Sequence, residues 1–261
     1  MIVTNDLEVR VGARTLLEAP GHHLRVQHGD RIGLIGRNGA GKTTTMRILS
    51  GETEPHGGSV TVSGPIGYLP QDSREGNLEQ TARNRVLSAR GLDEIRRSMD
   101  KQQHRMETET DPDKQAKAIE KFSRMEERYH ALGGYEADSE CAQICDNLGL
   151  PQRVLDQKLN TLSGGQRRRV ELAQILFAAT AGSGKSDTTL LLDEPTNHLD
   201  ADSITWLRHF LSKHEGGLLM ISHDVELLEA VCNKVWFLDA TRAEADVYNM
   251  GSVSYTHLRA H

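Results

Sequence analysis

Short apolar runs separated by glycine and polar residues mark the first 35 residues of the chain. They predict three β-strands, at Leu7–Val11, His23–Val26 and Ile32–Ile35. Residues 36–50 follow the pattern of a glycine-rich loop and a helix, and residues 58–70 that of a short β-hairpin. From residue 161 to 251, helix-like and strand-like runs alternate, and this alternation is typical of an α/β domain.

The region between these parts, residues 78–160, has a helical pattern and is strongly charged at its centre. Residues 91–130 contain 10 acidic and 9 basic residues. Apolar residues recur near helical spacing at Ile95, Met99, Met106, Ile119, Phe122, Met125 and Tyr129. Because Thr110–Asp113 combines a helix stop with a helix start, we predict two antiparallel helices with one narrow apolar seam. The charge pattern alone favours an ordinary solvated hairpin over a protruding arm that contacts a partner.

Composition narrows the class of protein. The 261 residues include 31 Lys and Arg against 37 Asp and Glu, which gives a net charge of −6. That balance argues against a generic basic nucleic-acid binder, but it does not exclude a local basic patch. No apolar run approaches the roughly 18–20 residues that span a bilayer, and the first residues lack a secretory signal pattern. We therefore expect a cytoplasmic protein without a membrane span, with Cys141, Cys145 and Cys232 as buried thiols.

A phosphate-binding loop follows the third predicted strand. Residues 36–43 match the pattern G-x-x-x-x-G-K-[ST] between an apolar strand and a helix. Its glycines let backbone N–H groups surround a phosphate, and the helix N-terminus favours anions. Lys42 would bridge the β- and γ-phosphates, and the Thr43 hydroxyl would bind Mg²⁺. The nucleotide-binding residues predicted here are Gly36, Asn38, Gly39, Gly41, Lys42, Thr43 and Thr44.

A second Gly-Lys-Ser sequence, within Gly182–Ser186, lacks the first glycine of this pattern. Ala179 stands in the required position, and no predicted strand leads into the segment. We interpret it as a surface loop that joins a helix to the next strand.

An apolar strand that ends in two carboxylates is predicted at Thr189–Glu194. A fully apolar run suits a central strand of a parallel sheet. Asp193 at its end can hold the Mg²⁺ shell, and Glu194 can orient and deprotonate a water molecule. Adjacent acids are commonly only solvated. Their place after a buried strand, in a chain with a phosphate-binding loop, favours a catalytic role instead.

A third motif precedes a predicted helix. Leu162-Ser163-Gly164-Gly165-Gln166 places Ser163 as an N-cap, and the two glycines allow a close backbone approach. Such a helix start is a second anion site, although an ordinary capped helix after a loop has the same pattern. With the phosphate-binding loop and the Asp-Glu pair in this order, the chain resembles an ATP-binding cassette (ABC) ATPase over residues 4–251. The resemblance implies a P-loop ABC-type α/β core with an antiparallel β-subdomain and an α-helical subdomain.

The resemblance also implies roles for further residues. Gln71 resembles the Q-loop glutamine, Asp200 the D-loop at the seam between two cassettes, and His223 the switch histidine at the γ-phosphate. The family holds ATP between one cassette's P-loop and the other's signature, so the Ser163–Gln166 segment would act on ATP bound by a partner cassette. The implied catalytic residues are Glu194, His223, Lys42 and Gln71, the implied metal ligands are Thr43, Gln71 and Asp193, and the implied cofactors are ATP and Mg²⁺.

The residues after the Asp-Glu pair indicate a subfamily. The sequence Pro-Thr-Asn-His-Leu-Asp at residues 195–200, with the charged insert at residues 91–130, resembles the ABC-F group. Its members carry two cassettes in one polypeptide and typically act on ribosomes in translation or antibiotic resistance, and the insert corresponds to their arm. The implied partners are therefore a second cassette and the ribosome with its RNA. Two alternatives stay open: the ATPase subunit of a membrane transporter, and a nucleotide-gated binding module without hydrolysis.

Two departures from the family pattern affect these expectations. No aromatic ring for stacking on adenine lies near the first strand, where Val11 takes the usual position. Residues 252–261 resemble an adapter-derived translation, so we expect them to be a non-native tail. The expected organisation is a truncated first cassette over residues 1–251, with a helical subdomain at residues 72–160.

Overall fold

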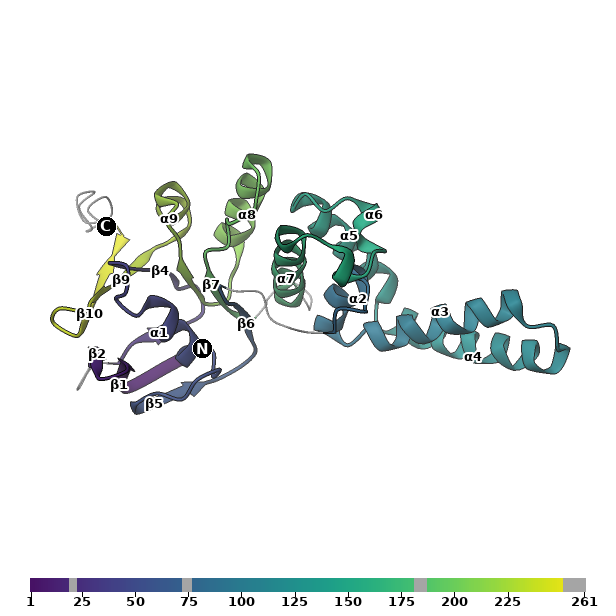
Figure 1. The fold of residues 1–261 in the computed structure, drawn as a ribbon, viewed down its shortest axis with the longest axis horizontal. Coiled ribbons are helices and arrows are strands. Elements are labelled where there is room, and N and C mark those ends of the chain that lie inside the picture. Colours follow the sequence, from purple (N-terminus) through teal and green to yellow (C-terminus); the bar gives the residue numbers. More distant parts are fainter. Residues whose placement is uncertain (19–22, 72–76, 181–186, 251–261) are drawn as a thin grey trace. The chain divides into compact units, whose positions relative to one another are not determined.

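The computed structural model describes residues 1–18, 23–71, 77–180 and 187–250 (Figure 1). The chain divides into two compact units. The first comprises Met1–Arg74 and Gly182–His261 and contains the β-sheets, whereas the second, Glu75–Ala181, is helical. This division separates the phosphate-binding loop and the Asp-Glu pair, in the first unit, from the Ser163–Gln166 segment in the second.

A six-stranded sheet organises the first unit. Its strands, in spatial order, are β10 (Glu244–Asn249), β9 (Lys234–Asp239), β4 (Arg31–Gly36), β8 (Leu218–Ile221), β7 (Thr189–Asp193) and β6 (Ile66–Leu69). All neighbours are parallel except the antiparallel pair of β9 and β10. β7 and β8 are buried at every position, as expected of central parallel strands. The carboxyl ends of β4, β6, β7 and β8 therefore meet at one edge of the sheet.

The second sheet is antiparallel and is built around β1 (Ile2–Val11). This strand pairs with β2 (Arg14–Glu18), β3 (Arg25–Val26) and β5 (Gly57–Val62). The predicted hairpin at residues 58–70 is wrong, because β5 joins this sheet while β6 pairs with β7 in the other one. Burial explains the separation. β6 is almost entirely buried and suits the interior sheet, whereas β5 is mostly exposed.

In the described part of the first unit, three helices accompany the sheets. α1 (Lys42–Leu49) contributes Met46, Ile48 and Leu49 to a single apolar cluster that includes residues of both sheets. α8 (Ala201–Lys213) and α9 (Val225–Val231) begin at capping aspartates. Asp200 accepts a hydrogen bond from the backbone N–H of Ser203 at 2.9 Å, and Asp224 accepts one from that of Leu227 at 3.0 Å. These caps define where each helix starts after its preceding strand.

The predicted helical hairpin is confirmed in the second unit. α3 (Asp93–Thr108) and α4 (Pro112–Ala131) lie side by side and extend away from the other helices of this unit (Figure 1). Asp111 caps α4 by accepting a hydrogen bond from the backbone N–H of Asp113 at 3.0 Å, and Pro112 occupies the first turn. The stop and start signals in the sequence therefore mark the turn correctly.

The seam of this hairpin is apolar but differs from the prediction at one position. Met99, Ala118 and Tyr129 are buried, as a narrow seam requires. Ile119 was expected there and is instead 47% exposed, because the small Ala118 takes the buried position one residue earlier on α4. Among the described residues, no helix is both long enough and apolar enough to cross a membrane.

The body of the helical unit surrounds the helix that follows the Ser163–Gln166 segment. Its elements are α2 (Ala82–Leu87), the 3₁₀-helix η1 (Ser88–Arg90), α5 (Gly134–Asn147), α6 (Gln152–Leu155), the 3₁₀-helix η2 (Leu159–Thr161) and α7 (Gly164–Ala179). Because α7 packs against α2 and α5, this unit extends beyond the predicted boundary at residue 160. Cys141 and Cys145 are buried free thiols on α5, and Cys232 is buried in the first unit, as predicted.

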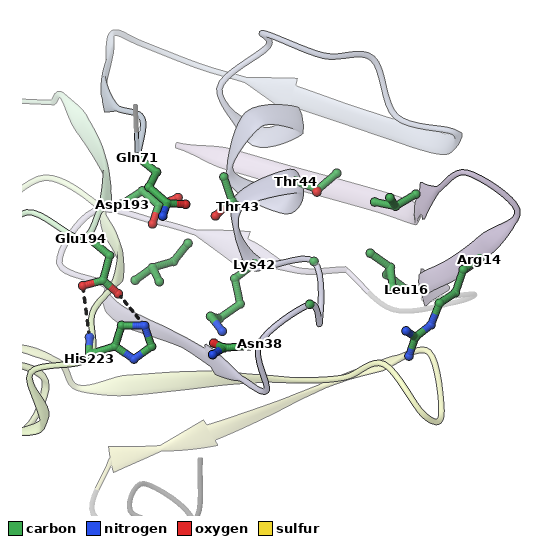
Figure 2. Close-up of a pocket in the computed structure, with 14 residues that line it drawn as sticks. Arg14, Leu16, Asn38, Lys42, Thr43, Thr44, Gln71, Asp193, Glu194 and His223 are labelled. Carbon is green, nitrogen blue, oxygen red and sulfur yellow. Dashed lines mark hydrogen bonds and ion pairs between the residues drawn. The ribbon is translucent and has the colours of Figure 1, made fainter. Parts of the chain in front are cut away.

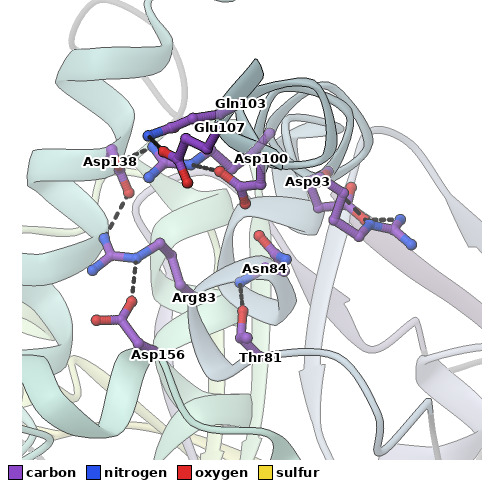
Figure 3. A network of polar contacts seen from close by, with 11 residues as sticks. Thr81, Arg83, Asn84, Asp93, Asp100, Gln103, Glu107, Asp138 and Asp156 are labelled. Carbon is purple, nitrogen blue, oxygen red and sulfur yellow. Dashed lines mark hydrogen bonds and ion pairs between the residues drawn. The ribbon is translucent and has the colours of Figure 1, made fainter. Parts of the chain in front are cut away.

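A cluster of ion pairs joins the hairpin to the body of the helical unit (Figure 3). Asp138 on α5 lies at its centre, where it accepts hydrogen bonds from Arg83 of α2 and Arg96 of α3, both at 2.7 Å. Arg83 also pairs with Asp156 at 3.2 Å, and Arg96 with Asp100 at 3.3 Å. The side chains of Arg83 and Asp138 are 11% and 19% exposed. One carboxylate therefore holds two guanidinium groups that are largely removed from water.

We expect the substitution Asp138→Ala to lower the free energy of unfolding by about 2 kcal/mol, because two partly buried guanidinium groups lose their shared acceptor. Urea unfolding followed by circular dichroism measures the loss. The matched control is Glu120→Ala on α4, which removes the 3.2 Å partner of Arg124 from a pair whose side chains are more than 70% exposed. The control should change stability by less than about 0.5 kcal/mol. Equal losses for both variants would contradict a special role for the Asp138 cluster.

Candidate functional site

The carboxyl edge of the six-stranded sheet borders a cavity of about 380 Å³ (Figure 2). It is lined by Val11, Arg14, Leu16, Asn38, Gly39, Gly41, Lys42, Thr43, Thr44, Gln71, Asp193, Glu194, Ile221 and His223. The segments after β4, β6, β7 and β8 all contribute to it, since the ends of parallel strands meet at one edge. Predicted site residues from four distant parts of the sequence are thus brought together. Gly36 belongs to the same loop but does not line the cavity.

Two glycines shape the phosphate-binding loop between β4 and α1. Gly36 has φ 152° and Gly41 has φ 94°, in the region that side chains disfavour. A Cβ atom on Gly36 would lie 2.6 Å from the backbone oxygen of Leu238, and one on Gly41 would lie 2.9 Å from Cδ1 of Leu16. The loop therefore requires glycine at both positions, for its backbone conformation and for space.

Lys42 is the first residue of α1, and its side chain turns back over the loop. Its Nζ atom donates to the carbonyl oxygens of Gly36 at 2.6 Å and Arg37 at 3.2 Å. Burial lowers the pKa of Lys42, while the negative charges of Glu194 and Asp193 oppose this shift. The Lys42 ammonium group is thus held where it could contact an anion that the backbone N–H groups of the loop bind.

Glu194 follows β7 directly and has an unusual backbone conformation. Its φ of 50° lies in the left-handed region, which costs a residue with a side chain roughly 1–2 kcal/mol. Its backbone N–H donates to the carbonyl oxygen of Ile221 at 2.9 Å, and its Oε2 accepts from the backbone N–H of His223 at 3.3 Å. The His223 Nε2 atom lies 3.4 Å from Oε1 of the same carboxylate (Figure 2). These contacts fix a carboxylate that is only 9% exposed.

The environment of Glu194 changes its acidity. Burial raises the pKa of Glu194, and the charge of Asp193 adds to the rise, whereas His223 and Lys42 oppose it. A carboxylate with a raised pKa is a stronger base than an exposed one. The arrangement can therefore accept a proton from a water molecule in the cavity.

Three oxygen donors predicted as metal ligands line the same cavity. They are the Thr43 hydroxyl from α1, the Gln71 amide from the segment after β6, and the Asp193 carboxylate from the end of β7. Asp193 is 1% exposed. Mg²⁺ prefers a few oxygen ligands and keeps several waters, so this donor set fits it. In the described part of the chain, no group of three or more His, Cys, Asp or Glu side chains could hold a metal ion.

The Ser163–Gln166 segment starts α7 in the helical unit, as predicted. Ser163 Oγ accepts from the backbone N–H of Gln166 at 3.2 Å, and Gln166 Oε1 accepts from that of Ser163 at 3.0 Å. This reciprocal pair is a capping box. Neither this segment nor Asp200 lines the cavity. Their assigned roles at a second cassette stay predictions.

Arg14, Leu16 and Ile221 line the cavity although the motifs did not single them out. Ile221 ends β8, two residues before His223. Arg14 and Leu16 lie on β2, close to Val11, where the family pattern has an aromatic ring. The absence of an aromatic residue at the position of Val11 was therefore the sequence signal that could have pointed to Arg14 and Leu16 as site residues. The predictions for Gly182–Ser186 and for residues 252–261 fall outside the described residues.

Known proteins share both the sequence pattern and the fold. The family model described as "ABC transporter" matches residues 20–197. The tylosin resistance ATP-binding protein TlrC of Streptomyces fradiae is 36% identical over 222 residues, which are 83% of this chain and 38% of that protein. The energy-dependent translational throttle protein EttA of Haemophilus influenzae is 36% identical over 219 residues, or 83% of this chain and 37% of that protein. ABC transporter F family member 5 of Arabidopsis thaliana is 33% identical over 215 residues, which are 80% of this chain and 30% of that protein.

The chain spans less than half the length of these relatives. A solved structure, the dimeric post-hydrolysis state of the ATP-binding cassette MJ0796 bound to ADP and Pi, has a TM-score of 0.61 and 17% identity. The comparison covers 96% of this chain and 99% of that one, and it confirms the predicted P-loop ABC-type fold with its helical subdomain. With the family match over more than half of its residues, the chain belongs to the ABC transporter family as an ATP-binding cassette, the ATPase domain of that family.

Proposed function

We propose that this chain is the first cassette of an ABC-F protein, which hydrolyses ATP to ADP and phosphate and acts on the ribosome. The observation that carries the hydrolytic part is the convergence of Lys42, Glu194 and His223 on one cavity. Each would have a distinct task. Lys42 neutralises β- and γ-phosphate oxygens, Glu194 accepts a proton from the attacking water, and His223 orients the Glu194 carboxylate and contacts the γ-phosphate.

Further residues would position the substrate and the metal. Backbone N–H groups of Asn38, Gly39 and Gly41 would surround the phosphates, with Thr44 in the first turn of α1. Thr43, Gln71 and Asp193 would hold Mg²⁺, which when bound neutralises phosphate charge. Water attacks the γ-phosphorus in line, the bond to the ADP oxygen breaks, and the proton of the water passes to the Glu194 carboxylate.

Pairing with a second cassette is part of the proposal. The Ser163–Gln166 segment starts a helix, and its backbone N–H groups could meet an anion supplied by another cassette. The solved cassette MJ0796 is described as dimeric, which supports pairing in this family. The partner here would be either the second cassette of the complete protein or a second copy of this chain.

The ribosomal part of the proposal is supported by the names of the relatives. One relative is a translational throttle protein, one is an antibiotic resistance protein, and one is an F family member. The Pro-Thr-Asn-His-Leu-Asp sequence at residues 195–200 and the confirmed hairpin of α3 and α4 are consistent with that group. A cytoplasmic location would follow.

The surface of α4 offers a specific contact for an RNA partner. The α4 basic stripe consists of Lys114, Lys117, Lys121, Arg124 and Arg128. These residues recur at intervals of three and four, so they share one face of the helix, and all are exposed. A row of cations on an otherwise acidic chain suits contact with a phosphate backbone.

Sedimentation with purified ribosomes tests this function. In the presence of ATP, we expect the chain to sediment with ribosomes, and the double substitution Lys117→Glu and Lys121→Glu to reduce the bound fraction about tenfold. The reason is that it removes two phosphate contacts and adds two repulsive charges. Binding should also weaken as salt concentration rises.

The matched control reverses two exposed cations in the first unit, Arg25→Glu and Lys213→Glu, and it should bind ribosomes like the unmodified chain. No ATP-dependent sedimentation, or equal loss in both double variants, would contradict the ribosomal proposal. Recovery of the chain with a membrane subunit would favour a transporter ATPase instead.

A further inference from the structure

The end of the cavity formed by β1 and β2 carries a cation that the proposed reaction does not use. Val11, Arg14 and Leu16 line this end. Arg14 is exposed, and among the described residues no hydrogen bond or ion pair engages its guanidinium group. In contrast, Arg10 on β1 pairs with Glu8. The Arg14 side chain is thus available to a ligand in the cavity.

The order of groups along the cavity determines which part of a nucleotide meets Arg14. In the proposed reaction the γ-phosphate lies beside Glu194, because the attacking water is activated there. The remaining phosphates follow the loop that carries Lys42. The base and ribose are then left at the end away from Glu194. Figure 2 shows Arg14 and Leu16 on the opposite side of Lys42 from Glu194.

Among the described residues, this end of the cavity has no aromatic ring on which a base could stack. None of the described residues that line the cavity is Phe, Tyr or Trp, and Val11 is 55% exposed. A planar guanidinium group can take the place of an aromatic ring, since it stacks on π-systems and adds a cation–π attraction. Leu16, which is 3% exposed, offers only apolar contact at this end.

We propose that Arg14 stacks its guanidinium plane on the base of the bound nucleotide and is the residue that gives this chain its affinity for a nucleoside over a bare polyphosphate. The inference rests on the proposed nucleotide site. Stacking is tolerant of base identity because every base has a π-face. The ligand class is therefore a nucleoside phosphate whose base is held by its face rather than by its edge.

Calorimetric titration with ADP and with inorganic pyrophosphate, both with Mg²⁺, tests this role without turnover. We expect Arg14→Ala to weaken ADP binding about tenfold and to leave pyrophosphate binding unchanged. Arg14→Lys, which keeps the charge but loses the plane, should recover little ADP affinity. Adding Val11→Tyr to Arg14→Ala should restore ADP binding, because a ring then replaces the guanidinium group.

The control Arg25→Ala, an exposed position on β3, should bind both ligands like the unmodified chain. Equal weakening of ADP and pyrophosphate in Arg14→Ala would overturn the inference, because Arg14 would then be a phosphate contact. Unchanged ADP binding would overturn it as well. If the unmodified chain binds neither ligand, the proposed nucleotide site itself fails and the role of Arg14 fails with it.

Discussion

Replacing Glu194 by Gln should reduce phosphate release by about a thousandfold, because the amide cannot accept a proton from water. The substitution keeps the shape of the side chain and one acceptor for the His223 N–H, so the loop should remain in place. Phosphate release is measured at high protein concentration, since a complete site needs two cassettes. ATP binding should persist, because Glu194 makes no phosphate contact in the proposed site.

The control for this experiment is Glu229→Gln, an exposed carboxylate on α9 that does not line the cavity. It should release phosphate at the unmodified rate. The pH dependence provides a second measurement, because burial raises the pKa of Glu194 and only the ionised carboxylate is a base. The rate should therefore increase as pH rises through that raised pKa. Equal rates for Glu194→Gln and the unmodified chain would falsify the hydrolytic proposal and leave a nucleotide-gated binding module.

The sequence was informative wherever a function depends on a short, local pattern. The loop at residues 36–43 must follow a strand and precede a helix, and its pattern is visible in eight consecutive residues. The same holds for Ser163, whose hydroxyl accepts a hydrogen bond from the backbone N–H of Gln166, three residues later. The turn at Asp111 and Pro112 was also predictable, because capping and proline act within one turn of helix.

The sequence did not predict features that depend on contacts between segments far apart in the chain. Nothing between residues 58 and 70 indicates that β5 and β6 belong to different sheets, since that depends on β1 and β7 as partners. The left-handed backbone of Glu194 is similarly hidden, because Ile221 at the end of β8 and His223, two residues further on, stabilise it. Arg14 joins the cavity for the same reason: only the folded sheet brings it near the phosphate-binding loop.

Changing Gly36 to Ala should destabilise the fold by about 3 kcal/mol, which combines the cost of a left-handed backbone with a steric clash. The φ of 152° disfavours any side chain, and the new Cβ would lie 2.6 Å from the backbone oxygen of Leu238. For a chain of this length, the thermal midpoint should fall by roughly 10 °C. Differential scanning fluorimetry without nucleotide measures the shift independently of binding.

Gly39→Ala separates the two contributions, because Gly39 has φ 81° but a Cβ there would meet no atom within 4 Å. We expect a loss of only about 1 kcal/mol in this variant. The clash at Gly36 cannot be relieved easily, since Leu238 lies directly opposite Gly36 in the pairing of β4 with β9, and β9 is held on its other side by β10. Moving the Leu238 oxygen would therefore disturb two strand pairings at the base of the phosphate-binding loop. Similar losses for the two alanine variants would mean that backbone conformation alone, rather than the contact with β9, selects glycine at the start of the loop.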